Sequence, residues 1–122
     1  MQTGKSTPGA SNDPSLFVEF FGDYPFIRVL DFLLENDAFD YSKKDICRYS
    51  NVSWNTLDTF WNQLEREQIV APTRKVGKAM LYKLNSRNPI VEQLRALDQR
   101  LMRASLQKVD PKKIKPIAAD SD

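Results

Sequence analysis

The sequence predicts a mainly α-helical domain with one small β-hairpin, an α+β fold. Two observations carry this prediction. Apolar residues recur at helical spacing along most of the chain, and the period changes to strand-like alternation only between residues 70 and 84. With 122 residues, 41% of them hydrophobic, the chain has the length and the apolar side chains to form one core.

Two helices are expected first. A short one over residues 14–22, PSLFVEFFG, starts at Pro14 and ends at Gly22. A stronger one lies within residues 23–36, and its inward positions recur at helical spacing: Phe26, Val29, Leu30, Leu33 and Leu34. Asp31 and Glu35 fall on the opposite face, where we expect a solvated acidic surface. The polar stretch NDAFDY should end this helix.

Two helices joined by a tight turn are expected next. Ser42 can cap a short helix over residues 42–50, and Asp45 supplies the acidic half of a capping box. In the turn SNV, Asn51 tolerates a left-handed conformation. Ser53 then caps a helix over about residues 54–68, and its inward positions are Leu57, Phe60, Trp61 and Leu64.

The strand-like segment is predicted to form a basic β-hairpin, and a long helix should follow it. The expected turn of the hairpin is residues 75–78, where Gly77 can take a positive φ. Asn88 and Pro89 start the final helix, and its apolar stripe is heptad-like: Ile90, Leu94, Leu97, Leu101 and Ala104. This stripe either folds back on the first helices or pairs with the same helix of a second subunit.

The predicted elements divide the chain into four parts. Residues 1–13 are expected to be a disordered tail, residues 14–88 the main domain, residues 89–107 a helix for dimerisation or packing, and residues 108–122 a flexible basic tail. Helix, short helix, turn, helix, hairpin and helix is the order of a winged helix-turn-helix domain with an extra C-terminal helix.

The chain resembles the small winged helix-turn-helix transcription regulators common in archaea. The resemblance covers about residues 16–105 and rests on FFGDYPFIRVLDFLLEN, SKKDICRYSNVSWNTLDTFWNQLEREQIV, RKVGKAMLYKLN and NPIVEQL, in that order. It implies a regulator that binds double-stranded DNA, usually as a homodimer. The expected dimer interface combines the aromatic face of the first helix with the stripe of the last: Phe17, Phe20, Phe21, Ile90, Leu94, Leu97 and Leu101.

The helix over residues 54–68 is the expected recognition helix, because the second helix of this motif lies in the major groove of DNA. The outward residues near its start are expected to contact bases: Trp54, Asn55, Asp58, Thr59 and Asn62. Asparagine can pair with adenine, aspartate can accept from cytosine, and an indole can press on thymine methyl groups. Contacts of this kind select a sequence but supply little affinity.

Affinity is expected to come from phosphate contacts on either side of this helix. Residues 71–83 hold four basic residues and no acid, whereas residues 16–40 hold six acids and one base. The hairpin, residues 72–84, is therefore the expected wing on the phosphate backbone. The candidate phosphate contacts are the basic side chains and helix-start hydroxyls around the motif: Lys43, Lys44, Arg48, Ser53, Thr56, Arg74, Lys75 and Lys78.

Other interpretations remain open. Residues 53–68 carry a net charge of −2, so the alternative is a winged helix that binds a partner protein, with Trp54 as the anchor. Cys47 is either a small buried residue or, beside Arg48, a redox-sensitive thiol. For Phe32, Phe60, Trp61 and Tyr82, core packing is the expected role.

The composition argues against an enzyme. The chain has no histidine and a single cysteine, so the commonest general base and zinc ligands are missing. The stretch GKST at residues 4–7 lacks the earlier glycine and strand of a phosphate-binding loop. We expect no metal, no cofactor and no small-molecule ligand. The polar N-terminal residues do not read as a signal peptide, and no run approaches a membrane span, so the expected compartment is the cytoplasm.

Overall fold

The computed structural model describes residues 15–107 of the chain. Within these residues the chain forms five helices and a three-stranded antiparallel sheet, which confirms the predicted α+β class. The expected tails, residues 1–13 and 108–122, and the helix start at Pro14 lie outside the described residues. No helix of the described part combines the length and the apolar character needed to cross a membrane.

The bounds of the first two helices follow from the residues at their ends. α1 (Leu16–Phe21) starts at Ser15, whose Oγ accepts a hydrogen bond from the backbone N–H of Val18 at 3.1 Å. It ends at Gly22, which has a φ of +106°, and a Cβ there would meet the Tyr24 ring. α2 (Pro25–Glu35) has its proline at the first helical position, and it buries five side chains: Val29, Leu30, Phe32, Leu33 and Leu34.

The third and fourth helices, α3 (Lys43–Ser50) and α4 (Trp54–Arg66), have the predicted N-caps. Ser42 Oγ accepts from Asp45 N–H and Ser53 Oγ from Thr56 N–H, both at 3.1 Å. The full capping box is not formed, because the Asp45 carboxylate pairs with Arg48 instead.

The C-termini of α3 and α4 close in the same way. Asn51, after α3, has a φ of +57° as predicted, and Val52 N–H donates to Cys47 O. Gln68, after α4, has a φ of +60°, and Ile69 N–H donates to Leu64 O. This left-handed residue ends α4 two residues earlier than predicted, and it turns the chain toward the sheet.

The sheet contains one strand that the sequence did not predict. β1 (Tyr41–Ser42) pairs with β3 (Ala79–Leu84), which also pairs with β2 (Val70–Val76), so the strand order is β1-β3-β2. The loop between β2 and β3 is two residues long rather than four, and Gly77 has a φ of +61°. A two-residue strand has no alternation to reveal it in the sequence.

The core lies where α1, α2, α3, α4, the sheet and the start of the last helix meet. Its largest fully buried side chains come from every one of these helices: Trp61, Phe17, Ile46, Leu57, Leu64, Val29 and Val91. Phe60 is only partly buried and meets Phe26 edge to face, with ring centroids 5.2 Å apart. Cys47 is buried and burial raises the pKa of its thiol, which favours the small buried residue over the redox-sensitive one.

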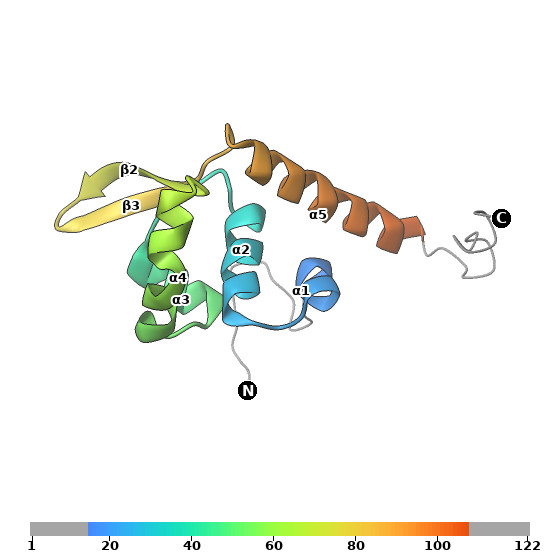
Figure 1. Cartoon of the computed structure of the whole chain (residues 1–122), viewed down its shortest axis with the longest axis horizontal. Helices are drawn as coiled ribbons and strands as arrows, with labels where there is room; N and C mark the ends of the chain where they lie inside the picture. Colours follow the sequence, from blue (N-terminus) through green and yellow to red (C-terminus); the bar gives the residue numbers. More distant parts are fainter. Residues whose placement is uncertain (1–14, 108–122) are drawn as a thin grey trace.

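The last helix, α5 (Pro89–Gln107), begins above α2 and its far end extends beyond α1 (Figure 1). Its inward residue at the start is Val91, which is fully buried, whereas Ile90 of the predicted stripe is 52% exposed. Leu94, Leu97 and Leu101 are partly buried. The first half of α5 therefore packs on the core of its own chain.

Candidate nucleic-acid interface

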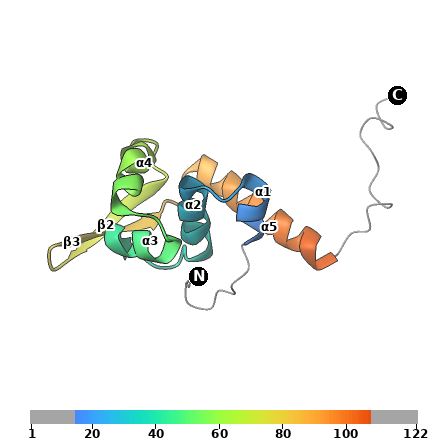
Figure 2. The same cartoon turned by 90° about the horizontal axis from the view of Figure 1, so that it is seen from below.

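Helices α3 and α4 and the β2–β3 hairpin lie at one end of the molecule. In both views α3, α4 and the β2–β3 hairpin lie together, and α5 runs away from them on the other side of α2 (Figure 1, Figure 2). The hairpin projects well beyond the helices, and every residue from Pro72 to Met80 is exposed. This end has the exposed surface that a nucleic acid would need.

The predicted base-contacting residues share one exposed face of α4. All five are exposed and lie opposite the buried stripe of Leu57, Trp61 and Leu64: Trp54, Asn55, Asp58, Thr59 and Asn62. The Thr59 hydroxyl donates to the carbonyl of Thr56 at 2.6 Å, so it is already used within the helix. The other four polar or aromatic side chains remain directed outward from the helix.

Trp54 has a neighbour that accounts for its position. The Lys43 ammonium lies 5.5 Å from the centroid of the Trp54 ring and 5.6 Å from that of Trp61. A lysine over two indole rings gains a cation–π attraction. Lys43 comes from the first turn of α3 and Trp54 from the first turn of α4, so this contact joins the starts of the two helices. Trp54 nevertheless remains 51% exposed.

The side chains on α3 and α4 that were predicted to contact phosphates differ in their exposure and in whether they already have a partner within the chain. Lys44 is exposed, and Lys43 is half-buried under the indole rings. Arg48 pairs with Asp45 at 3.2 Å and lies over the Tyr49 ring. Ser53 and Thr56 hydrogen-bond each other at 2.9 Å as part of the N-cap of α4. Of these side chains, Lys44 is the exposed cation with no ion pair within residues 15–107.

In the hairpin, Arg74 is not a free cation. Its Nε donates to Asp40 Oδ2 at 3.0 Å and its Nη2 to Asp40 Oδ1 at 3.3 Å, and Thr73 Oγ1 also donates to this carboxylate. These hydrogen bonds lower the pKa of Asp40 to about 2. The predicted phosphate contact of Arg74 would therefore require a phosphate to displace the Asp40 carboxylate, which already neutralises the charge of this guanidinium. Lys75 and Lys78, at the tip, are exposed and form no ion pair within residues 15–107.

The sequence did not predict the role of Arg28, which hydrogen-bonds to the turn between α3 and α4. From α2, its Nε donates to the carbonyl of Ser50 and its Nη2 to that of Asn51, both at 3.0 Å. Its Nη1 pairs with Asp23 at 2.8 Å. Arg28 thus ties the turn between α3 and α4 to α2. The only signal in the sequence was a lone base in an acidic segment, and it gave no partner.

The acidic face of α2 lies away from this interface and is not fully solvated. Asp31 is partly buried, one of its carboxylate oxygens is buried without a hydrogen-bond partner, and Asp98 of α5 is nearby. Burial raises the pKa of Asp31 to about 6 and that of Glu35 to about 7. Repulsion from Asp98 adds to the pKa shift of Asp31, and repulsion from Asp31 and Asp98 adds to that of Glu35. The expectation of a solvated face is therefore wrong for Asp31. No group of acidic, cysteine or histidine side chains in residues 15–107 is arranged to hold a metal ion.

Comparison of the chain with protein-family models, with curated proteins and with solved structures finds no match in any of the three.

Proposed function

We propose that the chain is a winged helix-turn-helix transcription regulator that binds double-stranded DNA as a homodimer. The observation that carries this proposal is a single exposed end on which α4 presents five outward side chains beside a projecting basic hairpin. The element order and the three-stranded sheet are compatible with a winged-helix layout. The proposal includes no catalytic activity, metal or cofactor.

In the proposed complex, α4 enters the major groove with its first two turns against the base edges. Asn55 and Asn62 would donate and accept with adenine, and Asp58 would accept from cytosine. Trp54, steadied by Lys43, would cover thymine methyl groups. Arg28 supports this role indirectly, because it fixes the turn from which α4 departs.

The proposed phosphate contacts come mainly from three lysines. Lys44 flanks α4, and Lys75 and Lys78 lie at the hairpin tip. Arg48 and Arg74 would contribute only if phosphate replaced their carboxylate partners, Asp45 and Asp40. A small number of phosphate contacts per protomer predicts modest affinity for random DNA and a measurable salt dependence.

The proposed dimer surface is narrower than the sequence suggested. Phe17 is 1% exposed in the core of its own chain, so it cannot serve a second subunit unless the core opens. Of the other predicted interface residues, Phe20 and Phe21 of α1 and Ile90 of α5 are exposed, and three residues of α5 are partly buried: Leu94, Leu97 and Leu101. Light scattering at about tens of micromolar should give the mass of two chains. A mass of one chain would overturn the homodimer.

Fluorescence anisotropy tests DNA binding itself. A labelled random-sequence duplex of about 30 base pairs is titrated with the full chain at roughly 50 and 200 mM salt. We expect binding at low salt that weakens steeply at high salt. Lys75→Ala with Lys78→Ala should weaken binding and reduce the salt slope by about two per protomer. Arg100→Ala with Arg103→Ala removes the same charge from exposed positions of α5 and should change neither. No binding at the low salt concentration would overturn the proposal.

A second candidate function is a winged helix that binds a partner protein. It is favoured by the three acids and one base of residues 53–68, and by an exposed tryptophan, a residue type common at interface hot spots. Under this alternative the lysine pair has little effect, and Trp54→Ala abolishes partner capture. The anisotropy titration decides between the two.

A further inference from the structure

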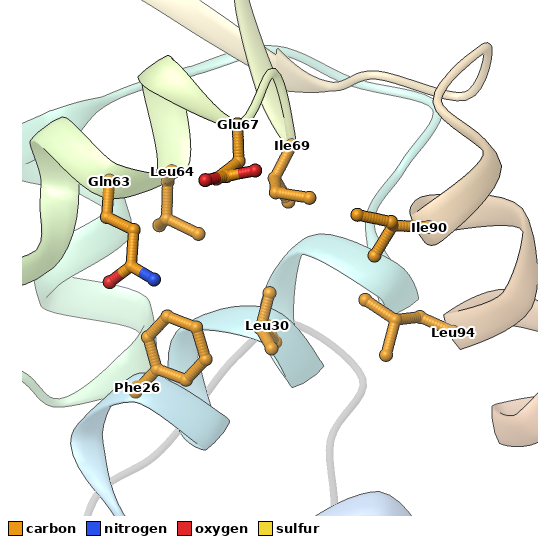
Figure 3. A pocket seen from close by; sticks show the side chains of 8 residues that line it. All are labelled: Phe26, Leu30, Gln63, Leu64, Glu67, Ile69, Ile90 and Leu94. Atoms are coloured by element: carbon orange, nitrogen blue, oxygen red, sulfur yellow. The ribbon is translucent and has the colours of Figure 1, made fainter.

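An apolar pocket lies between α2, α4 and the first half of α5, with a volume of about 340 Å³ (Figure 3). Six apolar side chains line it: Phe26, Leu30, Leu64, Ile69, Ile90 and Leu94. The volume is within the range of small-molecule sites, which are mostly apolar with a few polar groups that fix orientation. The pocket is made by residues up to 68 positions apart in the chain, so no local sequence pattern could reveal it.

The polar groups of the pocket lie on one side and come from α4. Gln63 and Glu67 are one helical turn apart and both edge the pocket beside Leu64 (Figure 3). The Glu67 carboxylate forms no ion pair or hydrogen bond with any side chain of the described part, residues 15–107. Glu67 also caps the C-terminus of α4, where the helix dipole places partial negative charge.

We propose that this pocket binds a small organic cation with an apolar body and one ammonium group. The body would replace water against the six apolar side chains, and this burial would supply most of the affinity. The ammonium would donate to the Glu67 carboxylate and to the Gln63 amide oxygen, both of which are acceptors. An anionic ligand of the same shape would face Glu67 and the helix C-terminus, and no lining residue carries a positive charge.

A ligand in the pocket would contact both the proposed recognition helix, α4, and the helix that carries part of the proposed dimer surface, α5. Gln63 and Leu64 belong to α4, the proposed recognition helix, and Glu67 is its C-cap. Ile90 and Leu94 belong to α5, part of which forms the proposed dimer surface. A ligand in contact with both would change DNA affinity if it fits the DNA-bound and free arrangements unequally. This regulatory role rests on the proposed function, but binding of the cation does not.

The test uses methyl NMR spectra of the full chain and three probes of one shape. Cyclohexylmethylammonium, cyclohexylmethanol and cyclohexanecarboxylate differ chiefly in charge. We expect the ammonium to shift the methyl signals of Leu30, Ile69 and Leu94 with a Kd of about millimolar, the affinity typical of so small a ligand. The neutral alcohol should bind about fivefold more weakly, and the carboxylate more weakly still.

A matched pair of variants isolates the carboxylate. Glu67 is exposed, so Glu67→Gln should fold, and it should reduce ammonium binding to the level of the alcohol while alcohol binding stays unchanged. Glu92→Gln, an exposed position of α5 outside the pocket, should leave all three affinities unchanged. Retained ammonium preference in Glu67→Gln would overturn the proposal. Failure of every probe to shift the pocket methyl signals would overturn it as well, whether the pocket is closed in solution or covered by a second copy of the chain.

Anisotropy titrations with and without the ammonium probe separate this proposal from the proposed function. If the chain binds DNA but no probe shifts the pocket methyl signals, the ligand site is wrong and the DNA-binding proposal is unaffected. If the probe binds in the pocket but the chain does not bind DNA, the site is correct and its regulatory role is wrong.

Discussion

Asp40, just before β1, holds the guanidinium of Arg74 in β2, with Arg74 Nε 3.0 Å from Asp40 Oδ2. The two residues are 34 positions apart, and the sheet brings them together because β1 and β2 flank the same central strand, β3. In the proposed complex a phosphate would compete with Asp40 for Arg74.

The first prediction follows from this competition. Asp40→Asn removes the carboxylate and frees the Arg74 charge, so it should tighten binding to random duplex DNA by about threefold to tenfold at low salt. Anisotropy measures the change, and Asp40→Asn with Arg74→Ala should return the affinity to about the wild-type level. Because the pKa of Asp40 is lowered to about 2, its ion pair stays intact above about pH 5, and the gain should not depend on pH there. Weaker DNA binding by Asp40→Asn would show that Arg74 does not face DNA.

The second prediction concerns the pH dependence of stability. The pKa values of Asp31 and Glu35 are raised to about 6 and 7, so the folded chain binds more protons than the unfolded chain between about pH 4 and 7. These two groups therefore make the free energy of unfolding fall as the pH rises through that range. Denaturant titrations should show a chain more stable at about pH 5.5 than at about pH 8.

Variants of Asp31 and Glu35 test whether these two residues cause the pH dependence of stability. Asp31→Asn and Glu35→Gln should each stabilise the chain at high pH and reduce the difference between the two pH values, because the neutral side chains cannot be charged. Glu92→Gln, which is exposed on α5, should leave the difference unchanged. A difference that survives in the double variant of Asp31 and Glu35 would assign it to other groups.

The third prediction concerns Arg28. Replacing it with methionine keeps much of the apolar stem but leaves the carbonyls of Ser50 and Asn51 without their donors. The free energy of unfolding should fall by about 1–3 kcal/mol. DNA affinity should fall further than stability alone explains, since α4 would no longer leave α3 at a fixed angle. Arg87→Met, an exposed loop position, is the control. Unchanged DNA binding by a folded Arg28→Met chain would contradict the positioning role.

The fourth prediction separates packing from recognition at Trp54. Because the ring is half-exposed, Trp54→Ala should cost only about 0.5–1 kcal/mol of stability, the size of its contact with Lys43. Affinity for a selected DNA site should fall by about tenfold, and affinity for random DNA much less. Trp54→Phe should restore part of the selectivity. Equal losses on selected and random DNA would mean that Trp54 does not read sequence.

Local sequence signals predicted most of the fold. Ser42, Ser53 and Asn51 are at the caps and the turn that their side chains favour. The inward stripes of α2 and α4 are buried as their spacing indicated, except that Phe26 and Phe60 are only partly buried. The structural features that the sequence did not predict depend on contacts between residues far apart in the chain. β1 exists because Tyr41 pairs with Tyr82. The inward residue at the start of α5 is Val91 rather than Ile90, because α5 packs on α1 and Val91 joins the core.

The sequence predicted which side chains of the candidate site lie on the exposed face of α4, but it did not predict the ion pairs and hydrogen bonds around them. Spacing alone placed Asn55, Asp58 and Asn62 on one exposed face of α4. It could not show that Asp40 holds Arg74 or that Arg28 holds the turn, because those contacts span 34 and 22 or 23 residues. The pocket beside Glu67 was missed for the same reason, since its walls come from three helices and the segment that joins α4 to β2.

Amide NMR spectra of the labelled chain, titrated with a short duplex, test the central claim most directly. We predict that signals shift in the first two turns of α4 and at the hairpin tip, Lys75 to Lys78, while those of the second half of α5 stay in place. Shifts confined to α5 and α1, or no shifts at all, would contradict DNA binding through α4 and the hairpin.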